Sequence, residues 1–374
     1  MVFVSLGIRA LINVEALNMV EAVGNVVRHR TVPYIYRRGR SYVIQWAPAI
    51  SGECLAHAYQ VYLAKVATKR GLPVCYWCMK EEFIKHFDLR FWVQTKNSIS
   101  YTSDEVKLAD KYKELGAASL DQMKEIERTI VKVCIVEDIG GFLVTQGAVK
   151  RTSRVWFSYM IPTLDSISQG AVAVDNQFLV RHAPTAESLR KTPVPPAQAP
   201  YYPQIASAIY GFTITLDVDS ISSSSIDGEP LVPKDEYKKR VLASLEAVKE
   251  MLDSKIFGAK LSRFNPMMEY EIIVALVSKS MKLMISPPTL GLEDFINDTI
   301  IRAVKAATDT GDEIKVIIWP SSTDIEKRVN EVLEKLKKQV KDIEKFYEVL
   351  PSKVSTVRDL INKVIEVVKS WKGW

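Results

Sequence analysis

Two segments decide the fold of this chain: VFVSLGIRALINV, residues 2–14, and SGECLAHAYQVYLAKVATK, residues 51–69. The first is rich in β-branched residues that alternate loosely, which predicts a long strand. The second begins with Ser51, a good N-cap, and precedes Gly71, so it predicts an amphipathic helix. The apolar face of this helix carries Leu55, Tyr59, Tyr62, Leu63 and Val66.

The remaining periodic segments extend this strand–helix start into a sheet. Alternating or β-branched runs predict strands at 142–144, 154–161, 209–218 and 271–278, and 3.6-residue periodicity predicts a helix at 235–252. Without the insertions, the order approximates strand, helix, strand, strand, helix, strand. That order indicates an α+β fold with a modified RNA-recognition-motif (ferredoxin-like) core, in which two helices cover one sheet face and the other face is open.

We expect insertions and an extension around this core. Residues 1–280 would form the core, with a helical insertion at about 75–135 and an excursion at about 162–205. Six prolines between Pro184 and Pro203 argue against any regular strand or helix there. Residues 281–374 would add a strand at 314–319, a helix with 3/4 spacing from Val329 to Leu350, and a final helix at 354–371. The last two helices are expected to pack as an antiparallel pair.

The charge of the chain is segregated. Its 374 residues carry a net charge of only +6, but residues 22–52 contain no Asp or Glu and five Arg. Aromatic residues interleave with the basic segments, and about half of them should be core. They are Tyr34, Tyr36, Tyr42, Trp46, Trp156, Phe157 and Tyr159. Guanidiniums bind phosphates bidentately and aromatic rings stack on bases, so the pattern favours a polyanion, with single-stranded RNA as a good fit.

The sequence argues against several other classes of protein. No apolar run approaches the roughly 20 residues of a membrane span, and the apolar start lacks the basic residues of a signal peptide, so we expect a cytoplasmic protein without a membrane partner. Cys75 and Cys78 form one C-x-x-C without a second. A zinc site would need Cys54, Cys134 or His86 as further ligands. We favour the interpretation that the cysteines are reduced or disulfide-bonded, so no metal or cofactor is predicted.

The sequence offers few candidates for a catalytic site, because no P-loop, dinucleotide-binding, zinc-protease or serine-hydrolase motif is present. His29 lies between two Arg, which should depress its pKa and keep the ring neutral. A neutral imidazole could stack on a base, hydrogen-bond a 2′-hydroxyl or act as a general base. The alternative function is therefore a ribonuclease, with His29 and His182 as acid and base or with Asp165 and Asp175 holding a metal.

Several blocks of sequence resemble one family. They are Leu17-Asn18 with Glu21, Gly24-Asn25, Arg28-His29-Arg30, the run from Pro48 to Gln60, residues 181–185, and the run from Ser207 to Asp217. Together, over roughly residues 1–280, they resemble the archaeal CRISPR-associated autoregulator (DevR-type) family, whose members form the backbone of the type I-A Cascade complex.

The resemblance implies a non-catalytic subunit that polymerises head-to-tail along CRISPR RNA, beside other Cascade subunits. Such subunits hold the spacer for pairing with target DNA, and the excursion would be a thumb that reaches the neighbouring copy. The resemblance favours Arg28-His29-Arg30 and Ser51-Gly52 as RNA contacts over the basic turn from Arg37 to Arg40. The expected RNA-binding residues are Asn25, Arg28, His29, Arg30, Ser51, Gly52, Lys150, Arg151, Arg154, Arg181 and His182.

Overall fold

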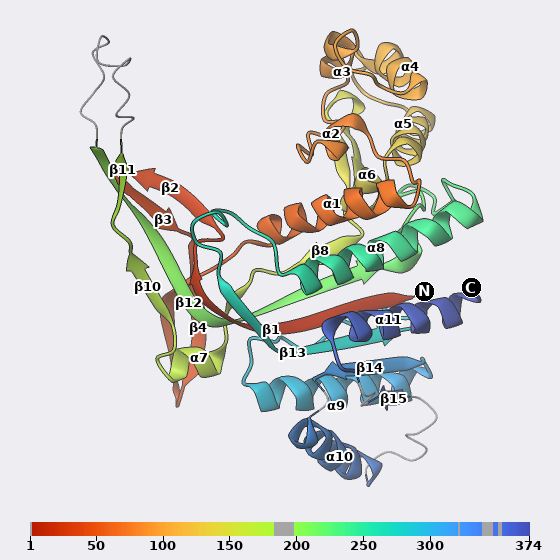
Figure 1. Ribbon diagram of the computed structural model, residues 1–374. Helices are drawn as coiled ribbons and strands as arrows, with labels where there is room; N and C mark the ends of the chain where they lie inside the picture. Colours follow the sequence, from red (N-terminus) through yellow and green to blue (C-terminus); the bar gives the residue numbers. More distant parts are fainter. Residues whose placement is uncertain (1, 183–197, 321, 339–346, 351–353) are drawn as a thin grey trace.

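The computed structural model describes residues 2–182, 198–320, 322–338, 347–350 and 354–374. The α+β class is confirmed: one large mixed sheet carries helices on both of its faces (Figure 1). Its strand order is β15-β14-β13-β1-β12-β3-β2, and four shorter strands pair with β12. No helix within the described ranges is long and apolar enough to cross a membrane.

The centre of the sheet is built from four antiparallel strands. β1 (Phe3–Glu15) lies between β13 (Met267–Ser278) and β12 (Gln198–Asp217), and β8 (Val155–Phe157) pairs with the far side of β12. Helices α1 (Gly52–Lys69) and α8 (Lys234–Ser254) lie side by side on one face, where the Tyr59 hydroxyl donates to the Ser244 carbonyl. In chain order these elements are strand, helix, strand, strand, helix, strand.

β1 is buried on both of its faces, as its central place in the sheet requires. Val4, Leu6 and Ile8 join the core under α1 and α8. The opposite side of the strand is also covered: a Cβ on Gly7 would lie 2.6 Å from the Phe295 ring of α9 (Leu292–Thr310). β13 is likewise buried on both faces. The expected open sheet face is therefore wrong for β1 and β13, because the unpredicted helix α9 covers them.

The C-terminal region differs from the prediction in two ways. α10 (Thr323–Lys337) ends earlier than expected, and Tyr347–Leu350 forms the strand β15, parallel to β14 (Ile314–Trp319). A short apolar run has no decisive period, so pairing with an edge strand determined its structure. α10 packs on α9, whereas α11 (Val357–Lys372) packs on α8 across the sheet. These two helices do not form the expected antiparallel pair.

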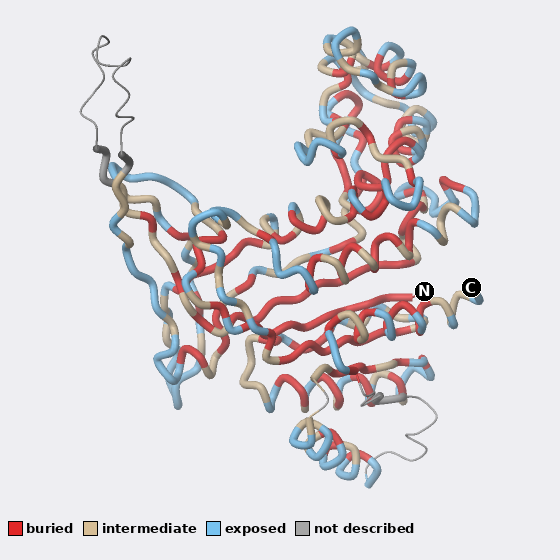
Figure 2. The backbone as a smooth tube through the Cα atoms, viewed as in Figure 1, coloured by how far each residue is buried: buried red, intermediate tan, exposed pale blue. Residues whose placement is uncertain are grey.

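Five helices between residues 76 and 140 project beyond α1 and surround a buried interior (Figure 2). Two of them, α4 and α5, begin with capping boxes, at Thr102 with Glu105 and at Ser119 with Gln122. The hairpin of β6 (Phe142–Val144) and β7 (Val149–Arg151) then leads into β8. The five helices are α2 (Tyr76–Met79), α3 (Leu89–Thr95), α4 (Ser103–Tyr112), α5 (Leu120–Val133) and α6 (Ile135–Gly140).

The opposite end of the molecule is a β-rich arm around the first half of β12 (Figure 1). Pro200 and Pro203 lie within β12, so the prediction of no regular structure is wrong from residue 198 onward. Pro203 lies between the parts of β12 that pair with β10 and with β11, so its missing N–H removes no hydrogen bond from either of these ladders. Residues 183–197 of the expected excursion lie outside the described residues. The other elements of the arm are β2 (Met19–Val23), β3 (Val26–His29), β4 (Thr31–Arg38), β5 (Ser41–Pro48), β9 (Ile161–Pro162), α7 (Leu164–Ser168), β10 (Ala173–Asn176) and β11 (Leu179–His182).

Candidate nucleic-acid interface

Arg30 and Ser51, two of the expected RNA-binding residues, are brought together by Asn18. The Asn18 Oδ1 atom accepts hydrogen bonds from Arg30 Nε and from the Ser51 backbone N–H, both at 2.8 Å. Ser51 caps α1 as predicted, since its hydroxyl accepts from the Cys54 N–H at 3.2 Å. The half-buried Arg30 side chain is thereby fixed beside the positive end of an 18-residue helix. This is an arrangement that attracts an anion.

Gly52 follows in the same turn, and its role is steric. A Cβ at this position would lie 2.4 Å from the Phe157 carbonyl oxygen of β8. The glycine therefore lets α1 approach the sheet closely, and nothing in this contact requires RNA. The Ser51-Gly52 pair thus serves as a helix start packed against β8.

Asn25 and Arg28 lie on the hairpin formed by β2 and β3. Both are exposed, and Arg28 forms an ion pair with Glu21 at 3.2 Å. Glu21 stands just outside the acid-free run, but the hairpin register places it opposite Arg28. The pair is so exposed that it leaves the guanidinium able to exchange partners with a phosphate.

His29 does not line a surface, which corrects its place among the expected RNA-binding residues. Its side chain is fully buried, with Nε2 at 2.7 Å from Glu15 Oε1 and Nδ1 at 2.8 Å from the Arg30 carbonyl. Tyr210 donates to the same Glu15 oxygen at 2.7 Å. Burial alone would lower the pKa of His29, but the hydrogen bond and charge of Glu15 outweigh it and raise the pKa. The expected depression by neighbouring arginines is therefore wrong.

The expected RNA-binding role of the basic residues Lys150, Arg151 and Arg154 also needs correction. The Arg151 side chain is fully buried and ion-paired with Glu127 at 2.7 Å and Asp138 at 2.5 Å. Arg154 is half-buried and donates to Ser225 Oγ at 2.9 Å, and burial lowers its pKa. Lys150 alone of the three is exposed. These residues lie beside α5 and the loop at 220–229. Arg151 is therefore not a candidate RNA contact.

Arg181 and His182 end β11, which pairs with Gln198–Tyr201 of β12 in the arm. The structure therefore places their backbone beside β12, and their side chains lie outside what is described. Neither residue is brought into contact with Arg30 by any described interaction.

A second cationic surface lies at the tip of the hairpin of β4 and β5. Arg38 and Arg40 are exposed there, and the turn is made by Gly39 with φ of 62°. Tyr42 is 75% exposed and Trp46 is 67% exposed on one face of the hairpin, whereas Tyr34 on the other face is buried. We name Arg37, Arg38, Arg40, Tyr42 and Trp46 the hairpin surface. The eight residues of β4 separate the Arg38 to Arg40 tip of this surface from Arg30 by about 25 Å, whereas Trp46 lies nearer to Arg30, opposite Pro33.

The expected RNA-binding residues did not include the hairpin surface. The resemblance to the family placed the expected contacts at Arg28-His29-Arg30 and Ser51-Gly52 instead of the Arg37 to Arg40 turn. The available signal was the alternation of β5, in which Tyr42, Ile44 and Trp46 share one face. In the described structure that face has no covering element, so its aromatic rings stay in solvent.

The described side chains among the residues proposed for a nuclease, those of His29, Asp165 and Asp175, each have partners elsewhere in the protein. Asp165 pairs with the buried Arg9 at 2.6 Å, while Asp175 is exposed on β10 and accepts from Gln177 at 3.2 Å. His29 is enclosed by Glu15 and Tyr210. A general base must reach its substrate, so a buried imidazole held by internal partners does not fit that role.

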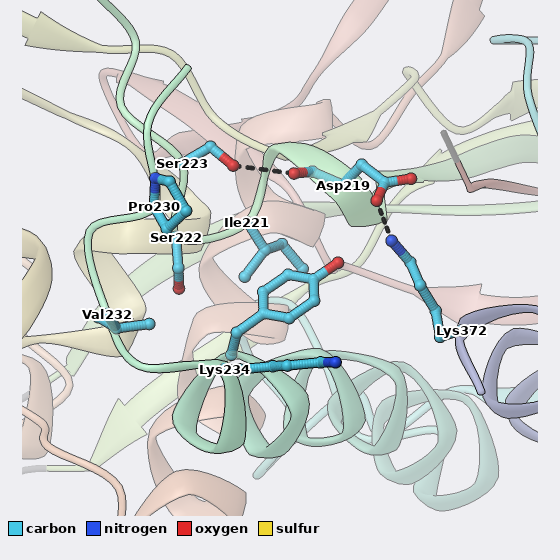
Figure 3. A pocket seen from close by; sticks show the side chains of 9 residues that line it. Asp219, Ile221, Ser222, Ser223, Pro230, Val232, Lys234 and Lys372 are labelled. Carbon is cyan, nitrogen blue, oxygen red and sulfur yellow. Dashed lines mark hydrogen bonds and ion pairs between the residues drawn. The ribbon is translucent and has the colours of Figure 1, made fainter. Parts of the chain in front are cut away.

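A pocket of about 370 Å³ (Figure 3) lies between the start of α8 and the end of α11, away from the arm (Figure 1). Lys372 of α11 forms an ion pair with Asp219 at its rim, and Ile221 and Val232 supply apolar wall. The pocket shares no lining residue with the basic arm. It is therefore separate from the candidate interface.

Comparisons with known proteins identify the class. The family described as CRISPR-associated negative auto-regulator DevR/Csa2 matches residues 6–300. The CRISPR-associated protein Cas7/Csa2 1 of Saccharolobus solfataricus is 35% identical over 301 residues, covering 79% of this chain and 86% of the relative. The CRISPR-associated aCascade subunit Cas7/Csa2 2 of the same organism is 33% identical, covering 81% and 87%. The chain belongs to the DevR/Csa2 family of CRISPR-associated proteins, as its sequence blocks indicated.

Solved structures give more distant matches. A chain of a "CRISPR RNA-guided surveillance complex, pre-nicking" superposes with a TM-score of 0.48 at 11% identity, covering 89% of this chain and 99% of that one. A chain of a second "CRISPR RNA-guided surveillance complex" gives 0.46 at 10% identity, covering 98% and 99%.

Proposed function

We propose that the chain is a CRISPR RNA-binding backbone subunit of an archaeal Cascade complex, and that it holds the guide without cleaving it. The observation that carries the proposal is the 33% identity with a protein named as an aCascade subunit, over 81% of this chain and 87% of that one. In this role the protein binds the RNA backbone, and pairing between guide and target DNA supplies sequence specificity.

Two surfaces on the arm are the proposed RNA contacts. Arg28 and Arg30 flank the buried His29 and point away from it, with Arg30 fixed by Asn18 at the start of α1. The hairpin surface adds exposed guanidiniums with Tyr42 and Trp46 as stacking platforms. Contacts of these kinds tolerate any base sequence, as a guide-holding subunit requires.

The proposed architecture is a modified RNA-recognition-motif core with insertions. Support comes from the antiparallel order β13-β1-β12-β8, with α1 and α8 on one face. In this proposal residues 1–280 are the core, about 75–135 the helical insertion, and 281–374 the C-terminal extension. Residues 162–205 act as a thumb on the next copy, since head-to-tail contacts that do not close give helical assemblies. Other Cascade subunits complete a cytoplasmic complex.

RNA binding can be measured by fluorescence anisotropy with a labelled CRISPR RNA at several salt concentrations. The double variant Arg28→Ala/Arg30→Ala should bind more weakly to every RNA sequence. Each lost phosphate contact should reduce the slope of log K against log salt by about 0.7 for a single strand. Lys363→Ala is the matched control, because Lys363 is another exposed, ion-paired cation but lies on α11.

Unchanged affinity and salt slope in a correctly folded double variant would remove Arg28 and Arg30 from the interface. A second assay addresses catalysis: repeat RNA incubated with the protein, with and without divalent metal, should stay intact. An RNA product that disappears in His29→Gln would favour the ribonuclease instead.

A further inference from the structure

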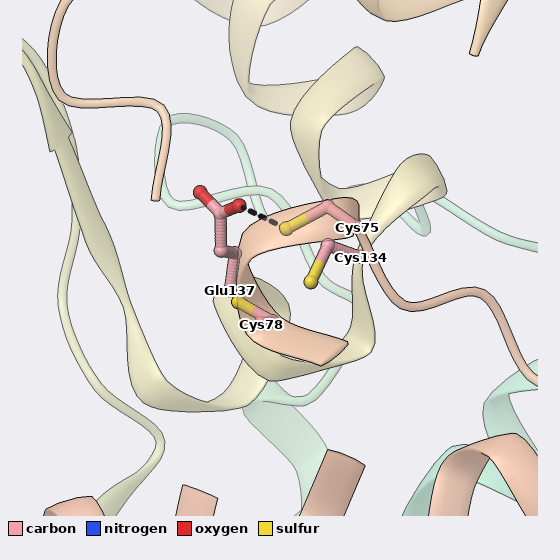
Figure 4. Close-up of side chains that lie close together, drawn as sticks. All are labelled: Cys75, Cys78, Cys134 and Glu137. Carbon is pink, nitrogen blue, oxygen red and sulfur yellow. Dashed lines mark hydrogen bonds between the residues drawn. The ribbon is translucent and has the colours of Figure 1, made fainter. Parts of the chain in front are cut away.

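Three thiols and one carboxylate converge inside the helical region between residues 76 and 140 (Figure 4). The sulfur atoms of Cys75, Cys78 and Cys134 and a carboxylate oxygen of Glu137 all lie within 4.8 Å of one another, and all four residues are buried. Among the residues that the structure describes, this is the one group of three or more His, Cys, Asp or Glu side chains with such spacing. None of them contacts the proposed RNA surfaces.

The four residues come from two short segments with the same spacing. Cys75 precedes α2 and Cys78 lies within it, whereas Cys134 joins α5 to α6 and Glu137 follows one turn later. The two segments are C-x-x-C and C-x-x-E, and a hydrogen bond from the Ile135 N–H to the Pro73 carbonyl, at 2.9 Å, holds them together. Two ligand pairs from two turns, each pair three residues apart, are typical of structural zinc sites.

The chemistry of the donors selects the metal. Thiolates are soft ligands that favour zinc over magnesium or calcium, and the separations suit a single tetrahedral ion. Glu137 is already oriented: its Oε1 atom accepts from Cys75 Sγ at 3.4 Å and lies 2.8 Å from His86 Nδ1, and its Oε2 accepts from the His86 backbone N–H at 3.0 Å. Partners of this kind, outside the ligands themselves, fix the geometry of a metal site.

We propose that Cys75, Cys78, Cys134 and Glu137 bind one zinc ion that joins α2 to α5 and α6. Binding exchanges the three thiol protons for the ion, without any redox step. The ion has a structural task, since α2 and α3 contain only 4 and 7 residues and helices so short are not stable by themselves. Sequence reasoning favoured a metal-free pair because it considered Cys134 and His86 as recruits but not Glu137.

The test starts with full-length protein purified without chelators or metal-affinity resin. Elemental analysis should find about one zinc per chain, and X-ray absorption should give three Zn–S distances near 2.3 Å and one Zn–O or Zn–N distance near 2.0 Å. Cys134→Ser should lose the zinc. Cys54→Ser is the matched control, because Cys54 lies outside the cluster on α1, and it should retain the zinc.

A second arm keeps the proposal falsifiable if Cys134→Ser does not fold. Wild-type protein stripped of metal should bind Co²⁺ with thiolate-to-metal charge-transfer absorption, and zinc should then displace the cobalt. Glu137→Cys should keep the zinc and add a fourth sulfur to the absorption spectrum. Failure of the wild type to bind either metal, or an intact mass showing a disulfide within the cluster of reduced-purified protein, overturns the proposal.

Discussion

Two sets of arginines in this molecule have opposite surroundings. Arg9, Arg151 and Arg240 are fully buried, and each is ion-paired with two carboxylates. Arg38 and Arg40, at the tip of the β4–β5 hairpin, are exposed, with no ion pair among the described residues. Arg9 and Arg151, like Arg38 and Arg40, occur in stretches without acidic residues, so a local count of charges does not distinguish these buried arginines from the exposed ones.

The difference lies in where the counter-charges come from. The partners of Arg151 stand 13 and 24 residues earlier, at Asp138 and Glu127, and the fold brings them to it. The hairpin tip from Arg38 to Arg40 protrudes. Among the described residues, the fold therefore brings no distant carboxylate into an ion pair with it. An unpaired basic stretch therefore indicates binding more reliably at a protruding turn than inside a strand that joins the core.

The largest effect is expected from Arg151→Met. Its removal leaves Glu127 and Asp138 buried with one partner fewer, so the free energy of unfolding should fall by about 3–5 kcal/mol. Chemical denaturation measures the change. Lys150→Met, at the exposed neighbouring position, should stay within about 0.5 kcal/mol. Equal effects at the two positions would contradict the distinction.

A smaller, pH-dependent effect is expected at the buried pair of His29 and Glu15. Because the pKa of His29 is raised in the folded state, its stabilisation is fully present below the unfolded pKa of about 6.5 and is lost as pH rises through the folded pKa. A double-mutant cycle of His29→Gln and Glu15→Gln, followed by denaturation at several pH values, should give a coupling of about 1.5–3 kcal/mol at the acid end. A coupling that grows with pH would reverse the assigned sign.

The exposed set should affect binding instead of stability. Arg38→Ala/Arg40→Ala should leave the free energy of unfolding within about 0.5 kcal/mol of wild type. It should weaken RNA binding and flatten the salt dependence, as measured by anisotropy. If RNA binding is unchanged while Arg28→Ala/Arg30→Ala is impaired, the interface is confined to the start of α1.

The smallest effect is expected at the exposed pair of Arg28 and Glu21. Glu21→Gln should change the free energy of unfolding by less than about 1 kcal/mol, because both side chains are more than half exposed. Removing this competing carboxylate should also strengthen RNA binding slightly at low salt. A loss of RNA affinity would instead assign Glu21 a positioning role.

The predictable part of the fold is local. β1, α1 with its Ser51 cap, α8 and β13 followed from periodicity and capping residues that lie within each segment. The strand β15 and the coverage of the sheet by α9 did not follow, because both depend on packing between segments distant in sequence. The same division holds for the site: the Ser51 cap follows from the local sequence, but the burial of His29 and Arg151 depends on Glu15, Asp138 and Glu127, which lie elsewhere in the chain.

The 20 residues of β12 form one uninterrupted strand that belongs to the arm at its start and to the core at its end. At about 3.3 Å per residue, its length along the backbone is some 65 Å. The arm is therefore joined to the core by continuous strand backbone, through the same strand that pairs with β1. Bending the arm requires breaking hydrogen bonds between β12 and its neighbouring strands β1 and β10. The distance between the arm and the centre of the sheet is therefore held by this pairing.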